Sequence, residues 1–141
     1  MGTRPPYREI EHTADVGIEL EAPDLASALE RAAAAMFDVM TDIERVGERW
    51  RAEVRVSGTD LQNLLVRWLS ELLFVAESHG VLLSRFSVRR LDGLSVEAEV
   101  AGEPLDRAKH LVRVEIKAVT YHELRIEEAG GGWAVRVVFD T

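Results

Sequence analysis

Carboxylates stand close to both ends of the sequence, in positions where strands are expected to begin or end. Asp15 closes the stretch His12-Thr13-Ala14-Asp15, and Asp140 is followed by Thr141. The side-chain carboxylate of Asp140 therefore lies beside the α-carboxylate of Thr141. Oxygen donors of this kind bind hard divalent cations. If the fold brings Asp15 to the same place, these groups predict an oxygen-rich metal site.

A second stretch, Lys117-Ala118-Val119-Thr120-Tyr121-His122, carries one cation and two polar aromatic side chains. Lys117 alternates with apolar neighbours, which places it on the polar side of an expected strand. Its ammonium can contact a phosphate or a partner's carboxylate, although the pattern alone favours a solvated lysine. Tyr121 and His122 form either a half-buried aromatic beside a surface imidazole or a polar rim around the same site.

Each acidic candidate also has an ordinary structural explanation. Asp15 can bond its own backbone in a turn, which is the usual role of aspartate there. Asp140 can be a solvated terminal acid. His12 can be a metal ligand, but a lone histidine more often orients a neighbouring turn through hydrogen bonds. The functional interpretation gains weight because a sheet can bring distant loops and strand ends together.

The sequence lacks the motifs of several enzyme classes. It contains no cysteine, which excludes thiolate-bound zinc and a cysteine nucleophile. A metal would need oxygen and nitrogen ligands, which suits Mg²⁺, Ca²⁺ or Mn²⁺. The run Gly130-Gly131-Gly132 lacks the lysine of a phosphate-binding loop and indicates a hairpin tip. Nothing in the sequence assembles a nucleophile, a base and an oxyanion hole.

Length and composition predict a single globular domain over residues 1–141. A chain of 141 residues with 47% apolar content can bury a sizeable core. Its apolar runs are too short to span a bilayer. The N-terminus has no apolar signal-peptide segment, so we expect a cytoplasmic protein. Residues 1–6 include two prolines and are expected to form a flexible leader.

The chain is acidic, with 25 acidic and 17 basic residues and a net charge of −8. Surfaces that bind nucleic acid need the opposite balance. We therefore do not expect this protein to bind RNA or DNA by itself. An acidic surface is better suited to docking on a basic protein, although solubility is the simpler explanation of the charge.

Two amphipathic helices are predicted. The first begins after Asp24, a suitable N-cap, and continues with apolar residues at helical spacing to about Met40. The second begins after Asp60 and ends at His79-Gly80, where Gly80 suits the left-handed position that ends many helices. The broad apolar face of the second helix predicts that it packs against a sheet.

Alternating apolar and polar residues predict the strands. Hairpin turns are expected at Asp92-Gly93 and at the triple glycine, and Gly102-Glu103-Pro104 is expected to end a strand. The expected strands are 7–11, 16–21, 51–57, 81–91, 94–101, 112–118, 124–126 and 133–139. This order predicts an α+β fold, with antiparallel or mixed sheet layers and two main helices packed on them.

Several motifs together resemble the archease family, small cytoplasmic accessory proteins of the tRNA-splicing RNA ligase. The resemblance covers nearly the whole chain. It is carried by His12-Thr13-Ala14-Asp15-Val16-Gly17, Ala35-Met36-Phe37, Met40-Thr41-Asp42, Asp60-Leu61-Gln62, Leu64-Leu65, the stretch 115–122 and Phe139-Asp140. Because these motifs occur in the right order and near the right termini, the combined match is more specific than any one of them.

The resemblance implies an activator rather than an enzyme. Archeases promote guanylation of a GTP-dependent RNA ligase, restore its multiple turnover and can broaden its nucleotide use. RNA would be contacted only through the ligase. The resemblance assigns a divalent-metal site, seen with calcium, to Asp15, Asp140 and the C-terminal carboxylate of Thr141. It also implies a role in activity for Lys117. Thr141 departs from the family, whose last residue is usually Ile or Val.

Two other classes of function stay open. A metal-dependent phosphohydrolase would use Asp15 and Asp140 and would turn over nucleotide alone. A chaperone-like module would bind its clients through an exposed apolar face of the long helix, without metal. For the activator, we predict the metal ligands named above. The predicted partner or activity residues are Lys117, His12, Tyr121 and His122.

Overall fold

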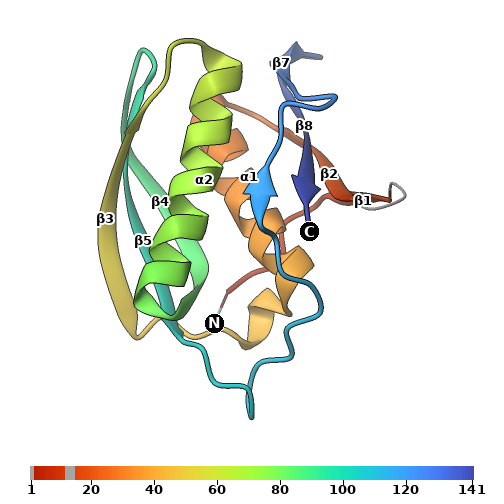
Figure 1. The fold of residues 1–141 in the computed structure, drawn as a ribbon. Coiled ribbons are helices and arrows are strands. Elements are labelled where there is room, and N and C mark those ends of the chain that lie inside the picture. The colour runs from red at the N-terminus through yellow and green to blue at the C-terminus, as the bar shows by residue number, and fades with distance from the viewer. Residues whose placement is uncertain (1, 12–14) are drawn as a thin grey trace.

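The structure, a computed structural model, describes residues 2–11 and 15–141 (Figure 1). The elements in chain order are β1 (Arg8–Glu11), β2 (Asp15–Ala22), α1 (Leu25–Met40), a 3₁₀ turn (Ile43–Arg45), β3 (Trp50–Ser57), α2 (Leu61–His79), β4 (Val81–Asp92), β5 (Ser95–Pro104), β6 (Ala118–Val119), β7 (Arg125–Ala129) and β8 (Gly132–Asp140).

Both helices begin and end where their capping residues predict. The carboxylate of Asp24 accepts a hydrogen bond from the backbone N–H of Ser27 at 2.7 Å. Asp60 does the same for Asn63 at 2.7 Å. Gly80 ends α2 with φ 63° and ψ 37°, a conformation that costs little without a Cβ. The predicted helix boundaries are therefore confirmed.

The strands form two antiparallel sheets. One has the order β1-β2-β8-β6, with β7 also paired to β8, and the other has the order β3-β5-β4. The last strand, β8, is therefore central: β2 pairs along one edge, while β6 and β7 share the other. The hairpins of β4 with β5 and of β7 with β8 confirm the two predicted turns.

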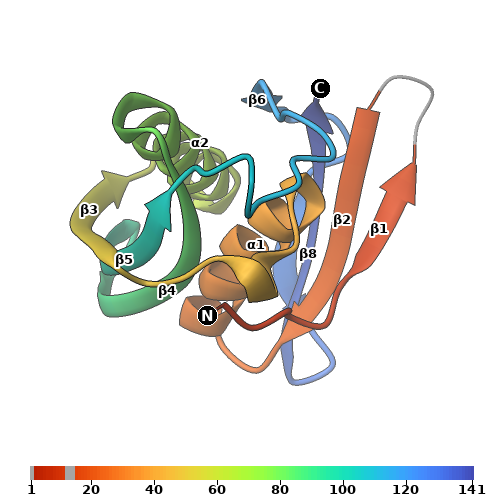
Figure 2. The ribbon, with the colours of Figure 1, turned by 90° about the horizontal axis from the view of Figure 1, so that it is seen from below.

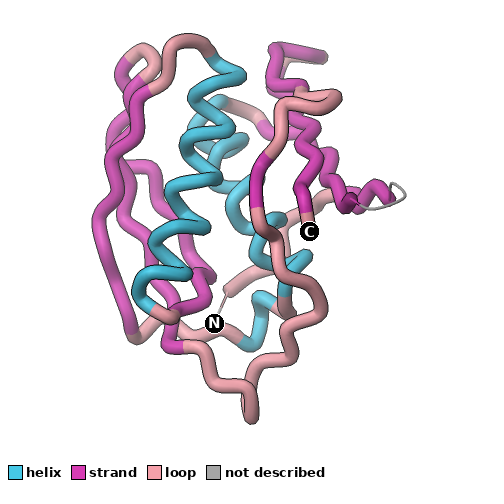
Figure 3. Tube along the Cα trace, viewed as in Figure 1, coloured by secondary structure: helices cyan, strands magenta, loops and turns pink. Residues whose placement is uncertain are grey.

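The helices lie between the two sheets, as the views in Figures 2 and 3 show. Helix α1 contacts β2, β8 and β4, and α2 contacts β3, β4 and β6. The largest fully buried side chains include Trp68, Phe37 and Phe139. The indole N–H of Trp68 donates to the backbone oxygen of Leu29 at 2.9 Å, which joins α2 to α1. This α+β arrangement of helices on antiparallel sheets confirms the predicted fold class.

The predicted strand 112–118 is wrong except at its end. Only Ala118 and Val119 pair with β8, and residues 105–117 form an irregular segment. The backbone N–H of Arg113 donates to the Met40 oxygen at 2.8 Å, and its guanidinium donates to the Thr41 oxygen at 3.1 Å. The segment therefore donates hydrogen bonds to the free carbonyl groups at the C-terminal end of α1 and does not pair with a neighbouring strand. Side chains of this segment still alternate between less exposed and exposed positions, because the helices cover one side of it as a sheet would.

The strand end expected at Gly102-Glu103-Pro104 is found at Pro104, although Gly102 and Glu103 still belong to the strand. Strand β5 continues to Pro104, which pairs with Val81 of β4. A Cβ at Gly102 would collide with the Leu82 carbonyl, so glycine permits close strand approach here. Pro104 is tolerated because it is the last residue of the strand.

The leader is in contact with the rest of the protein. The backbone N–H of Gly2 donates to the Val46 oxygen at 3.0 Å, and Arg4 forms an ion pair with Asp38 at 3.0 Å. The flexibility expected of residues 1–6 stays a prediction. No helix within residues 2–11 and 15–141 is long and apolar enough to cross a membrane.

Candidate functional site

The sheet brings Asp15 and Asp140 together at one end of the molecule. Asp15 is the first residue of β2 and Asp140 the last of β8, and the two are direct partners in the antiparallel register. Ala118 of β6 is the partner of Asp140 on the other edge. Figure 2 shows the C-terminus, β6 and the start of β2 at the same end of the sheet. We call this end, defined by Asp15, Ala118, Asp140 and Thr141, the pole.

The two carboxylates lie on the same face of the sheet. Residues directly opposite in an antiparallel pair have Cβ atoms about 5 Å apart, and like charges in that position destabilise the pair. Asp140 is exposed and Asp15 is half-buried. Within the described residues, no arginine or lysine forms an ion pair with either of them. The pole therefore holds two adjacent negative charges that the described chain does not neutralise.

Lys117 reaches the pole through its main chain. Its backbone N–H donates to the backbone oxygen of Asp140 at 2.8 Å. Its side chain is exposed and lines a cavity beside α2, and in the described residues its ammonium has no ion-pair partner. The backbone of Lys117 therefore lies next to Asp140, and the role of its side chain in activity stays a prediction.

Tyr121 and His122 lie in the loop between β6 and β7. They follow Thr120, whose backbone N–H donates to the Val138 oxygen at 3.1 Å. The Tyr121 hydroxyl accepts from the side-chain amide of Asn63 at 2.9 Å, at the start of α2. His122 lies 3.4 Å from the Glu123 carboxylate. These contacts join Tyr121 to α2 and His122 to its neighbour Glu123, and the role of both residues in partner contact stays a prediction.

The donor set at the pole consists of oxygen atoms. Among residues 2–11 and 15–141, no group of three or more His, Asp or Glu side chains could hold a metal ion. The predicted set contains only two such side chains, and its third member is the main-chain carboxylate of Thr141. The prediction for His12 falls outside the described residues. The oxygen donors of Asp15 and Asp140 fit a hard cation.

One buried acid, on α1, is not among the candidate residues that the sequence patterns single out. Asp38 is 2% exposed, and its carboxylate accepts hydrogen bonds from the Tyr7 hydroxyl at 2.8 Å and from the Ile43 backbone N–H at 3.1 Å. Burial, together with the hydrogen bond to Asp38, raises the pKa of the Tyr7 phenol. Arg4 supplies the counter-charge. These bonds use the Asp38 carboxylate fully, so we assign it a structural role.

A second buried cluster joins the end of β5 to the irregular segment. Glu103 is 3% exposed and His110 2% exposed. His110 Nδ1 accepts from the Asp106 backbone N–H at 3.0 Å, so Nε2 carries the proton and donates to Glu103 Oε1 at 2.7 Å. Burial alone would raise the pKa of Glu103, but hydrogen bonds from Lys109, the Gly47 backbone and His110 outweigh it and hold that pKa at about 2.

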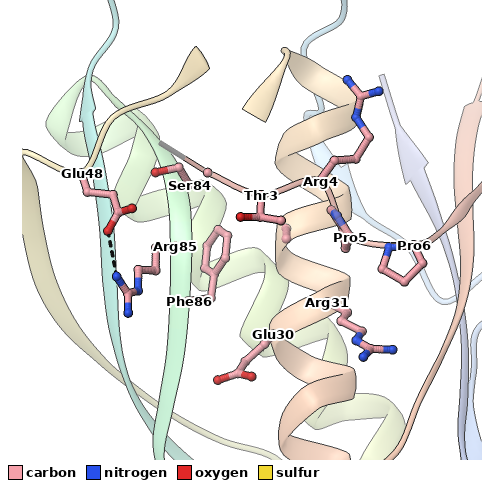
Figure 4. A pocket seen from close by; sticks show the side chains of 12 residues that line it. Thr3, Arg4, Pro5, Pro6, Glu30, Arg31, Glu48, Ser84, Arg85 and Phe86 are labelled. Carbon is pink, nitrogen blue, oxygen red and sulfur yellow. Dashed lines mark hydrogen bonds and ion pairs between the residues drawn. The ribbon is translucent and has the colours of Figure 1, made fainter. Parts of the chain in front are cut away.

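The cavity between α1 and β4 lacks converging polar groups. Figure 4 shows Phe86 at its centre, while the charged ends of Arg4 and Arg31 point away from it. Arg31 donates to the Glu21 backbone oxygen at 2.8 Å, and Arg85 pairs with Glu48 at 3.1 Å. A ligand site needs polar groups directed into the cavity, so we do not assign one here.

The broad apolar face of α2 is inside the protein. Leu64, Trp68 and Leu72 are fully buried, and Phe74 is the one large apolar side chain of this helix that is clearly exposed, at 64%. The exposed helix face on which the chaperone-like alternative depends is therefore reduced to Phe74.

Comparison with known proteins agrees with this fold. Residues 7–141 match the archease protein family (MTH1598/TM1083). The chain is 42% identical to protein archease of Sulfurisphaera tokodaii over 135 residues, covering 95% of this chain and 97% of the relative. It is 39% identical to protein archease of Methanopyrus kandleri over 138 residues, covering 96% and 99%.

Solved structures show the same architecture. The solution structure of Methanobacterium thermoautotrophicum protein 1598 has a TM-score of 0.83 and 36% identity, and the match covers 96% of this chain and 98% of that one. An archease from Thermotoga maritima, described as a possible chaperone, has a TM-score of 0.62 over 100% and 99% of the two chains. At 21% identity, that second likeness shows the fold alone. The family match over most of the chain and the identities to two archeases show that this chain belongs to the archease family.

Proposed function

We propose that this chain is a metal-binding activator of a GTP-dependent RNA ligase that acts in tRNA splicing or RNA repair. The observation that carries the proposal is the register of Asp15 opposite Asp140, without a compensating cation among the described residues. Membership of the archease family supports the choice of ligase as partner. The protein would act in the cytoplasm, promoting guanylation and multiple turnover of the ligase.

The proposed metal ligands are the side chains of Asp15 and Asp140 and the terminal carboxylate of Thr141. Oxygen ligands of this kind suit Ca²⁺, and Mg²⁺ or Mn²⁺ are further candidates in cells. A divalent ion bound there would neutralise phosphate charge and orient a phosphoryl group. The antiparallel pairing of β2 with β8 fixes the two side-chain carboxylates beside each other before any ligand arrives, which limits the entropy lost on binding.

Lys117, which lies next to the pole, would orient the ligase and its nucleotide. The hydrogen bond from the Lys117 backbone to the Asp140 backbone holds the residue before β6 against β8, and the exposed ammonium of Lys117 is able to contact a phosphate. The net charge of −8 favours a basic protein partner over direct contact with RNA. By binding one state of the ligase more tightly, the activator would shift the ligase toward the state that accepts guanylate.

The direct test is guanylation of the ligase in the presence of Asp15→Ala, Lys117→Ala or Asp140→Ala. We expect the wild-type protein to stimulate guanylation and the two aspartate variants to lose most of that effect, because each removes a metal ligand. Glu53→Ala is a matched control, since Glu53 also faces a carboxylate across neighbouring strands but lies on the other sheet. If the variants of Asp15, Lys117 and Asp140 all stimulate as well as the control, the site assignment is wrong.

Two further measurements separate this proposal from its alternatives. Adding residues after Thr141 replaces its α-carboxylate by a peptide bond, so we expect an extended protein to bind the metal more weakly. The phosphohydrolase alternative predicts that the isolated protein hydrolyses nucleotide with divalent metal present. We expect no turnover, because the described residues bring no nucleophile and base together beside Asp15 and Asp140.

A further inference from the structure

A cavity of about 540 Å³ opens between the C-terminal half of α2 and the irregular segment 105–117. We call it the groove. Figure 1 shows this segment running beside α2 and continuing into β6, so the groove leads to the pole. Its apolar walls include Phe37 and Met40 of α1, Leu73 and Ala76 of α2, and Val112 and Val114 of the segment.

Charged side chains of both signs line the groove together with the apolar ones. They are Glu77, Arg107, Glu115 and Lys117. All four are exposed, and in the parts of the chain that the structure describes none of them forms an ion pair. Many other acids of this protein are paired with arginine, as in Arg51–Glu99 at 3.0 Å. An apolar centre with unpaired charges around it is the usual anatomy of a protein interface.

An exposed aromatic residue lies beside the groove. Phe74 precedes Glu77 by three residues on α2 and is 64% exposed, so the two side chains are neighbours on the helix surface. Aromatic side chains at such positions often anchor protein contacts. The apolar surface of the groove is thereby extended along α2.

We propose that the groove receives one aromatic or branched aliphatic side chain of the protein that docks on the pole. This inference rests on the proposed function, because Lys117 lines the groove and also bonds Asp140 at the pole. A partner that covers the pole therefore also meets the groove. The partner would supply a basic group to Glu77 or Glu115 and an acidic group to Lys117 or Arg107. A second copy of this chain suits the groove poorly, since two molecules of charge −8 repel each other.

The test fills the groove with a larger side chain. Ala76→Trp places an indole in it, and Ala34→Trp is the matched control. Ala34 is also a half-buried helical alanine, and it lines a different cavity, the one between α1 and β4. Binding of each variant to the purified RNA ligase is measured by titration calorimetry in Ca²⁺. We expect Ala76→Trp to raise Kd about tenfold or more and Ala34→Trp to leave it nearly unchanged.

Binding and stimulation distinguish the groove from the pole. Ala76→Trp keeps Asp15 and Asp140, so at saturating concentration it should still stimulate guanylation. If Ala76→Trp binds like the wild type and stimulation is intact, the groove inference is wrong and the proposed function stands. If the wild type neither binds nor stimulates the ligase, both fail.

A surface substitution covers the case in which the tryptophan disturbs folding. Phe74→Ala removes an exposed ring, and we expect it to weaken ligase binding about threefold. Unchanged binding by Phe74→Ala, with Ala76→Trp unfolded, would overturn the inference. Sedimentation of the wild type tests whether a second copy of this chain occupies the groove. A wild-type dimer that Ala76→Trp dissociates would also overturn the inference.

Discussion

Two pairs of carboxylates face each other across neighbouring strands, one in each sheet. In the three-stranded sheet Glu53 of β3 is the register partner of Glu99 of β5. In the five-stranded sheet Asp15 of β2 is the register partner of Asp140 of β8. Like charges in this position destabilise a strand pair. The two sheets therefore present the same electrostatic problem in different places.

In the three-stranded sheet, arginine side chains of the same sheet compensate the facing carboxylates. Arg51 lies 3.0 Å from the Glu99 carboxylate and Arg89 lies 3.3 Å from it. A neighbouring pair, Arg55 with Glu97, adds an ion pair at 3.5 Å. At the pole, no arginine or lysine of the described residues takes this position. The contrast teaches that this fold accommodates facing acids in two ways. Among the described residues, the pair in the three-stranded sheet has arginine partners and the pair at the pole has none.

The largest effect is expected where a carboxylate is buried and fully compensated. Glu103→Ala leaves Lys109 and His110 without their acceptor. We expect it to lower the free energy of unfolding by about 3–5 kcal/mol, as when one partner of a buried ion pair is removed. Urea unfolding measures this. A loss below about 1 kcal/mol would show that the cluster contributes little.

The same residue gives stability a defined pH dependence. The pKa of Glu103 is held at about 2, below its ordinary value of 4.5. A lowered folded-state pKa stabilises the protein above the unfolded value, and that stabilisation is lost as pH falls from about 4.5 through about 2. Urea midpoints over this range should fall steeply for the wild type and less steeply for Glu103→Gln.

Metal binding at the pole should give the next largest effect. A ligand that binds only the folded state stabilises it by about 2.7 kcal/mol at one hundred times its Kd. We expect Ca²⁺ to raise the Tm of the wild type and of Glu53→Ala, and to leave Asp15→Asn and Asp140→Asn nearly unchanged. Thermal unfolding in Ca²⁺ against a chelator measures the shift. Equal shifts in all four proteins would place the ion elsewhere.

Much of this fold follows from local sequence signals. Asp24 and Asp60 predict the helix starts and Gly80 predicts the end of α2, because caps and left-handed positions depend on residues close in sequence. The Asp92-Gly93 turn is likewise local. Signals of this kind fix the elements but not their partners.

The errors lie where distant parts of the chain decide the structure. The alternation at 112–116 correctly predicts which side chains are less exposed, but the C-terminus of α1 replaces the neighbouring strand. Glu103 lies where a strand is expected to end, and it is buried because His110 and Lys109 fold back on it. At the pole, the sequence provides the acids, and only the register of β2 with β8 shows that they meet.

The repulsion between the facing carboxylates at the pole can be tested without metal, through a smaller effect that stabilises the protein. Asp140→Asn removes one of two facing charges, so in chelator it should raise the free energy of unfolding by about 0.2–1 kcal/mol. The corresponding change on the other sheet, Glu99→Gln, should lower it, because Arg51 and Arg89 lose their charged acceptor. Urea unfolding of both variants in chelator compares them. If both variants change the free energy of unfolding in the same direction, the two acidic pairs do not differ in the way described above.

The smallest effect is expected for an exposed ion pair of the three-stranded sheet. Arg55 is 78% exposed and lies 3.5 Å from Glu97, so Arg55→Ala should change the free energy of unfolding by less than about 0.5 kcal/mol. Guanylation of the ligase should also be unaffected, since this face is separate from the pole. Urea unfolding and the guanylation assay measure the two quantities on one protein preparation. Loss of stimulation with intact stability would mean that the ligase also contacts the three-stranded sheet. Partner contact would then no longer distinguish the pole from that sheet.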